Sequence, residues 1–237
     1  MGAANDYYSS LIHLLSAAGF LIAAPVLLQR LGRDPLRLFG GFLHVFGVLF
    51  LFVMSGTFHM CEHLWGAAHP TTESFRQLDH VGVWVLMGAF HTLPILLLLE
   101  GAWRWVTFSV IWGAALTGIA MKTFWWGMFT LGQSFVLYAA ASLVGVILIG
   151  RLIHQYGVRF NRPLFVFWGC FVAAAAAFVG QPPDLIPGVI GQHELWHLGI
   201  TGGAIAHWYF VLREATRTAS QPTELTVRPL PLPARAE

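Results

Sequence analysis

The sequence predicts an all-α protein, a bundle of seven transmembrane helices with its N-terminus outside and its C-terminus in the cytoplasm. Composition is the first observation behind this prediction: 57% of the 237 residues are hydrophobic, 10% are charged, and the mean hydropathy is +0.66. Soluble domains carry about 25% charged residues, so this chain lacks the polar side chains to cover itself in water. The second observation is a series of seven apolar segments, each long enough to cross a hydrocarbon core of about 30 Å as a helix.

Clear breaks separate these segments. RLGRDP follows the first, GAAHPTTES follows the second and QPPDLIPG precedes the last, and such runs of glycine, proline and polar residues end helices. A polar, proline-rich composition predicts a disordered cytoplasmic tail over 215–237, after a membrane domain over 1–214. The expected spans are Ser9–Leu28, Leu36–Phe58, Asp79–Leu99, Ala102–Met121, Met128–Gly150, Pro163–Gly180 and Gln192–Leu212.

The orientation follows from the basic residues, because positive charge is retained on the cytoplasmic side. Seven spans place the first, third and fifth connections on the same face as the C-terminal tail. The other face carries only Arg76 and Lys122. The face with the tail carries Arg30, Arg33, Arg37, Arg104, Arg151, Arg159, Arg162, Arg213, Arg217, Arg228 and Arg235.

Charge also argues against one class of partner. The formal net charge is +2, and the sequence has no basic run and no aromatic stacking platform. A nucleic-acid-binding protein carries such a basic footprint, so we expect no nucleic-acid partner.

Candidate site residues stand at the ends of three expected spans. They are Ser55 and His59 in SGTFH, Asp79 in QLDHVG, and His193 with His197 in HELWH. On a path that crosses the bilayer seven times, all three ends fall on the extracytoplasmic side. Ionisable groups at membrane depth are unfavourable and persist where they pair, line a wet cavity or hold a metal. Three histidines and a carboxylate at one level therefore predict a zinc (Zn²⁺) site.

Helical spacing supports this prediction. Ser55 and His59 are four residues apart, as are His193 and His197, so each pair shares one helix face. Three imidazoles leave the fourth tetrahedral position of zinc open for water, which is the mark of a catalytic site. Asp79 could then hold that water as general base, and Ser55 could donate a hydrogen bond to a developing oxyanion. The structural alternatives are that Asp79 caps the third span, that Ser55 is a small interhelical contact, and that the histidines bind headgroups.

The same residues carry a family resemblance. S-x-x-x-H ending the second span, Asp79 opening the third and H-x-x-x-H opening the seventh resemble the CREST superfamily of seven-helix membrane proteins. Within it, FHMCE (residues 58–62) looks most like the post-GPI-attachment phospholipase branch, and the N-outside orientation fits that branch and the ceramidases. Hemolysin III-like proteins carry A-G-T-Y-T-P after the aspartate, where this chain has MGAFHTLP, which argues against a hemolysin III assignment.

The resemblance implies a zinc-dependent intramembrane hydrolase that cleaves an amide or ester bond of a membrane lipid. It implies zinc held by His59, His193 and His197, with Ser55 and Asp79 beside the metal-bound water. The arginine-rich composition favours a bacterial cytoplasmic membrane, with the site facing its extracytoplasmic side.

Two other functions remain open from the sequence. His44, His91 and His207 are expected deeper in the bundle, where histidines can be axial ligands of haem in an electron-transfer protein. The simpler interpretation is that these three bind backbone carbonyls or Glu100. A receptor that keeps zinc as a structural element would use the same outer site without turnover.

Overall fold

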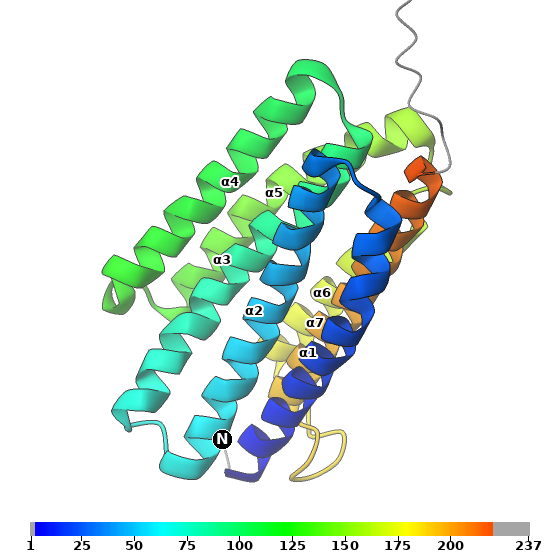
Figure 1. Ribbon diagram of the computed structural model, residues 1–237. Helices are drawn as coiled ribbons and strands as arrows, with labels where there is room; N and C mark the ends of the chain where they lie inside the picture. Colours follow the sequence, from blue (N-terminus) through cyan, green and yellow to red (C-terminus); the bar gives the residue numbers. More distant parts are fainter. Residues whose placement is uncertain (1–2, 220–237) are drawn as a thin grey trace, which may run out of the picture.

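Seven long helices and one short 3₁₀ turn make up the computed structural model (Figure 1). The structure describes residues 3–219, with side chains described for residues 6–218 apart from Leu131 and Phe135. Within the described residues there is no β-strand, only an isolated bridge between Ile186 and Ile190. The elements are α1 (Ala3–Leu31), α2 (Pro35–Trp65), α3 (Pro70–Leu98), α4 (Gly101–Phe124), η1 (Trp126–Met128), α5 (Leu131–Tyr156), α6 (Arg162–Gly180) and α7 (Gln192–Ala219).

Local capping sets where the helices begin. Asp34 accepts a hydrogen bond from the Arg37 backbone N–H at 2.9 Å, and Pro35 opens α2. His69 caps α3 in the same way, accepting from the Thr71 backbone N–H through Nδ1 at 3.2 Å, and Pro70 follows it. Proline suits this first position because the helix has no use for its missing N–H there.

The early start of α3 corrects one expectation. Asp79 was placed at the opening of the third span, but it lies two turns inside α3, which begins at Pro70. The apolar run that starts after Asp79 marks the part of the helix that can lie in the hydrocarbon core of a membrane. The helix itself begins earlier, at the cap formed by His69. Asp79 therefore does not cap α3.

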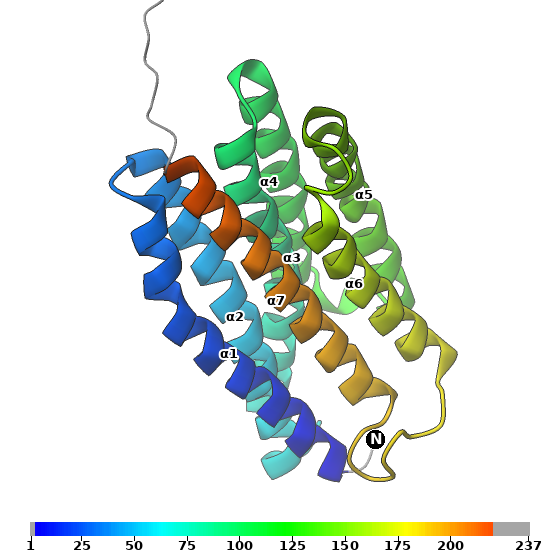
Figure 2. The same cartoon turned by 90° about the vertical axis from the view of Figure 1, so that its right-hand side faces the viewer.

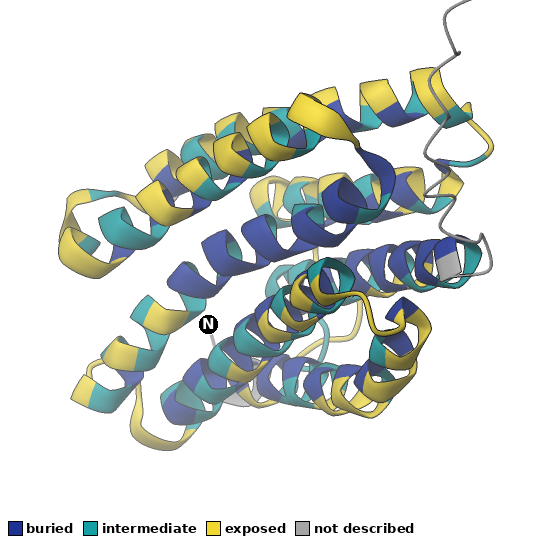
Figure 3. Cartoon of the chain, turned by 45° about the horizontal axis from the view of Figure 1, so that its top comes forward, coloured by how far each residue is buried: buried dark blue, intermediate teal, exposed yellow. Residues whose placement is uncertain are grey.

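The centre of the bundle is α3, in which 78% of the residues in an apolar 18-residue stretch are buried. Close approach of neighbouring helices depends on small residues: a Cβ on Gly47 of α2 would lie 2.2 Å from the Cβ of Ala89 on α3. A Cβ on Gly118 of α4 would lie 2.0 Å from the Trp84 ring. Figure 3 shows the buried residues on the inward faces of the helices and the exposed ones on their outer faces. Small residues at such crossings let helices pack by van der Waals contact in a membrane.

Six of the described helices are long and apolar enough to cross a membrane, and the chain is a multi-pass membrane protein. Seven helices form as expected, but α7 is not among these six. Its polar side chains face the protein interior: Glu194, His197, His207 and Glu214 are all buried. The orientation of the termini stays a prediction.

The far end of α7 is held by charged groups. Buried Glu214 accepts hydrogen bonds from Arg213 at 2.7 Å and Arg217 at 2.6 Å, and Arg213 also donates to the Phe160 backbone carbonyl at 2.8 Å. As a result α7 continues through Ala219, so the first residues of the expected tail are helical. The rest of that tail, 220–237, lies outside the described residues.

The helix ends that carry the candidate residues meet at one end of the bundle. The start of α1, the end of α2 and the starts of α3 and α7 all lie at the lower end in Figures 1 and 2. Figure 2 also shows α7 running between α1 and α6, in the same direction as α1. Residues from four helices can therefore contribute to one site.

Candidate metal centre

Three histidine side chains converge where α2 and α7 meet. The Nε2 atom of His59 lies 3.2 Å from Nε2 of His193 and 3.1 Å from Nε2 of His197. His59 and His197 are buried, at 2% and 3% exposure, and His193 is half-buried. These three imidazoles form a group with ligand atoms within 4.8 Å of one another, an arrangement that can hold a metal ion.

The separations fit zinc. Zinc binds imidazole nitrogen at about 2.0–2.1 Å in tetrahedral geometry, which places neighbouring ligand atoms about 3.3 Å apart. The two distances to His59 Nε2 are close to that value. The residues present thus offer three imidazole nitrogens, and both separations from His59 fit the spacing that the ion requires.

The other ring nitrogens have partners on α1. Nδ1 of His59 lies 3.4 Å from Oδ1 of Asp6, and Nδ1 of His197 lies 2.9 Å from Nε2 of His13. A proton on each Nδ1 would satisfy both contacts and would leave both Nε2 lone pairs facing each other at 3.1 Å. A cation between them stabilises that arrangement. Ligand histidines generally donate their second N–H to such a partner, which fixes the ring and raises its basicity.

Sequence reasoning missed Asp6 and His13. Both are buried, and they lie on one face of α1 together with Ser9, at intervals of three and four residues. This polar stripe at helical spacing in an otherwise apolar helix is the signal that could have found them.

Glu194 ties the first turn of α7 to α1. Its carboxylate accepts a hydrogen bond from the Ser9 hydroxyl at 2.8 Å and another from the Gly191 backbone N–H at 2.9 Å. Glu194 is fully buried, and a carboxylate near a helix start is favoured by the helix dipole. These bonds fix the register in which His193 and His197 approach His59.

The other two expected residues take different places. Ser55 is buried one turn before His59 on the same face of α2. The Asp79 carboxylate lies 3.8 Å from Nδ1 of His80, and among the described residues it belongs to neither group of potential metal ligands. The carboxylates gathered near His59 are those of Asp6 and Glu62.

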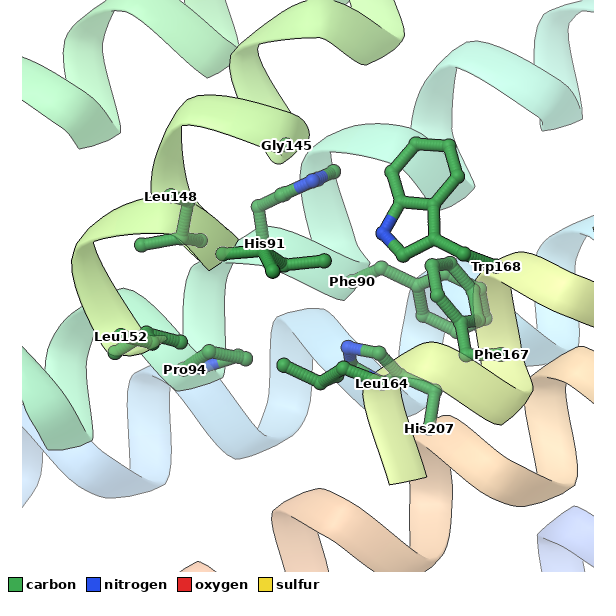
Figure 4. A pocket seen from close by; sticks show the side chains of 11 residues that line it. Phe90, His91, Pro94, Gly145, Leu148, Leu152, Leu164, Phe167, Trp168 and His207 are labelled. Atoms are coloured by element: carbon green, nitrogen blue, oxygen red, sulfur yellow. The ribbon is translucent and has the colours of Figure 1, made fainter. Parts of the chain in front are cut away.

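A second histidine cluster lies deeper in the bundle. The rings of His44 and His207 are stacked with centroids 5.2 Å apart, and both are buried. His44 and His91 bind the backbone carbonyls of Ala89 and Met87, as the simpler interpretation expected. Figure 4 shows His91 and His207 at a cavity of about 20 Å³, among aromatic and aliphatic side chains. That volume admits one water molecule, so the cavity gives no support to a haem.

Comparison with known proteins gives one family. The family model described as "Haemolysin-III related" matches residues 1–208. The chain is 27% identical to "Hemolysin-3" of Bacillus cereus over 178 residues, which covers 74% of this chain and 76% of that protein. It is 25% identical to "Hemolysin-3 homolog" of Bacillus subtilis (strain 168) over 186 residues, 71% of this chain and 74% of that protein.

These matches overturn one expectation. The absence of A-G-T-Y-T-P after Asp79 argued against hemolysin III, yet the family model spans that region. The short sequence A-G-T-Y-T-P alone does not decide membership of the family, because the family model matches residues 1–208. The preference for the phospholipase branch is not supported by these matches.

Proposed function

The chain belongs to the haemolysin-III related family, and from its histidine cluster we propose that it is a zinc-dependent hydrolase that cleaves an amide or ester bond of a membrane lipid. One observation carries this proposal: Nε2 of His59 lies 3.2 Å from Nε2 of His193 and 3.1 Å from Nε2 of His197, and the three side chains form one group of potential metal ligands. Three protein ligands leave a fourth position for water or substrate, which is how catalytic zinc sites differ from structural ones.

A zinc ion held there would supply a nucleophilic hydroxide near neutral pH and a Lewis acid for a carbonyl oxygen. The chain's own groups position the ligands. Asp6 would accept a hydrogen bond from the Nδ1–H of His59, and His13 would accept one from the Nδ1–H of His197. Ser55 would donate its hydroxyl proton to the oxygen on which negative charge develops. Asp79 would act as general base and accept, at a carboxylate oxygen, a proton from the attacking water.

The position of the cluster favours a lipid substrate. The cluster lies near one end of a bundle whose helices are long enough to cross a bilayer, so it is near the level of lipid headgroups. The amide and ester linkages of lipids lie at that level. We place the protein in a bacterial cytoplasmic membrane with this site on the extracytoplasmic side, a location that the Bacillus relatives fit.

Lipid turnover by purified protein tests this function. The wild type would be reconstituted in phosphatidylcholine vesicles containing ceramide, with zinc measured by elemental analysis and released fatty acid by mass spectrometry. We expect about one zinc per chain and fatty acid release. His197→Ala should lose both, and Asp79→Asn should keep zinc and lose release. His44→Ala, which removes a buried histidine of the deeper cluster, is the matched control and should keep both.

A protein that holds one zinc but releases no fatty acid from these or other lipids would contradict the hydrolase and favour a receptor with a structural zinc. A protein without zinc that still turns over lipid would contradict the role of the metal.

A further inference from the structure

An apolar groove runs between α1 and α7 on the outside of the bundle. Its volume is about 590 Å³, which is within the range of roughly 300–1,000 Å³ seen for small-molecule sites. Phe20 and Trp208, both buried, lie beneath it. The exposed or half-buried residues along its two walls are Leu15, Gly19 and Ala23 on α1, and Ile205, Tyr209 and Leu212 on α7.

The groove begins about one helical turn from the histidine cluster. Ser16 and Thr201 line the end of the groove nearest the histidine cluster, and their side-chain oxygens lie 3.2 Å apart. Ser16 is one turn after His13 on α1, and Thr201 is one turn after His197 on α7. The pair therefore stands about 5 Å from the level of the His13–His197 contact along the helices.

The length of the groove matches half a bilayer. From Thr201 to Leu212 it follows eleven residues of α7, which is about 16 Å at 1.5 Å per residue. One leaflet contributes about 15 Å of hydrocarbon. Because α1 and α7 both run away from the metal centre, the groove extends from the headgroup level toward the middle of the membrane.

At the end of the groove nearest the histidine cluster, both hydroxyl donors already have acceptors. Ser16 donates its hydroxyl proton to the Ile12 carbonyl at 2.6 Å, so Thr201 is the donor to Ser16. The backbone groups of both walls are bonded within their helices. A peptide in this groove would leave its own N–H and C=O groups without partners, which is unfavourable in hydrocarbon. A hydrocarbon chain needs none.

We propose that this groove binds one acyl chain of a membrane lipid and presents that lipid's linkage to the histidine cluster. Presentation of the lipid's amide or ester bond to the histidine cluster rests on the proposed function. Binding of the acyl chain rests on the groove alone. Three observations point to this occupant: the apolar lining, the one-leaflet length and the position of Ser16 and Thr201 one helical turn from the histidine cluster.

Gly19 allows a direct test, because a Cβ there would meet no atom within 4 Å. Gly19→Leu would fill the groove without disturbing a packed contact. The matched control is Gly113→Leu on α4, also an exposed helical glycine whose Cβ would meet no atom within 4 Å. The probe is a phosphatidylcholine with a photoactivatable diazirine on its acyl chain, present as a minor component of phosphatidylcholine vesicles that contain the full-length protein.

After irradiation, mass spectrometry of peptides locates the label. In wild type and Gly113→Leu, we expect residues 15–23 and 201–212 to be labelled more heavily than the exposed face of α4. Gly19→Leu should lose most of the labelling of these two segments. Ile205→Trp fills the groove from the other wall and should act in the same way, which keeps the test decisive if Gly19→Leu does not fold.

Labelling that is uniform over all exposed apolar faces, or that survives both filling variants, would overturn the proposal. So would a change in oligomeric state caused by Gly19→Leu, because the groove would then be an interface with a second copy. Labelling does not depend on turnover. If wild type is labelled in the groove but releases no fatty acid, the hydrolase proposal fails and the groove stands. If wild type releases fatty acid but is labelled nowhere in the groove, the groove proposal fails and the hydrolase proposal stands.

Discussion

Removal of His13 isolates the contribution of α1 to the metal centre. With zinc bound, Nε2 of His197 is a ligand, so its proton stays on Nδ1 and is donated to Nε2 of His13 across 2.9 Å. In His13→Ala that N–H is left without an acceptor in a site where His197 is only 3% exposed. Without zinc the proton of His197 can move to Nε2, so the penalty falls on the zinc-bound state.

The size of the effect follows from that unpaired group. A buried donor without a partner costs about 1–3 kcal/mol, which corresponds to a roughly five- to 150-fold higher Kd for zinc. Loss of a partner of a metal-bound histidine generally weakens metal binding by about 10–100-fold, which agrees with this range. His13→Gln restores an acceptor through its side-chain oxygen and should recover part of the affinity.

Competition with a chelator of known zinc affinity measures the Kd in detergent or vesicles. His44→Ala is the control, because it also removes a buried histidine but lies about 22 Å along α2 from His59. A folded His13→Ala protein whose Kd for zinc is within about twofold of the wild-type value would refute the reasoning. The hydrogen bond from His197 to His13 would then contribute less than about 1 kcal/mol to zinc binding.

Three further predictions concern the histidine cluster and the helix packing of the bundle. Asp6→Asn keeps an acceptor for His59 but loses its charge, so zinc affinity should fall about fivefold, less than for removal of a whole partner, and an unchanged Kd would exclude the Asp6 contact. Gly47→Ala should lower the stability of the bundle by about 1–3 kcal/mol, because its Cβ would stand 2.2 Å from that of Ala89, whereas Gly113→Ala should not; equal midpoints in thermal unfolding would contradict the α2–α3 packing. Removal of zinc by a chelator should lower the unfolding midpoint of the wild type and leave it unchanged in His197→Ala, because an ion that binds only the folded state stabilises it.

The helices could be predicted from the sequence because each one must present a long apolar surface to lipid. Their ends could not, since hydropathy marks the hydrocarbon layer and not the helix. The second span was expected to end at Phe58, but α2 continues to Trp65, and α3 begins at Pro70 because His69 caps it. These added turns include polar residues such as Glu62, His63 and Gln77, and they lie at the end of the bundle where α1 and α7 begin.

The candidate histidines could be selected from the sequence because the spacing of His193 and His197 is a property of a single helix. His193 and His197 lie on one face of α7 whatever surrounds them. His13 could not be identified in that way, since its contact to His197 joins residues 184 positions apart and depends on how α1 packs on α7. The same holds for Asp79, whose direction depends on the rotation of α3 and whose carboxylate lies near His80.

X-ray absorption at the zinc edge of the purified protein tests the metal centre most directly. We expect about one zinc per chain, bound by three imidazole nitrogens at about 2.0–2.1 Å and one further light atom, with the spectrum lost in His59→Ala. Absence of zinc, a sulfur ligand, or a spectrum unchanged in His59→Ala would contradict a zinc site built by α2 and α7.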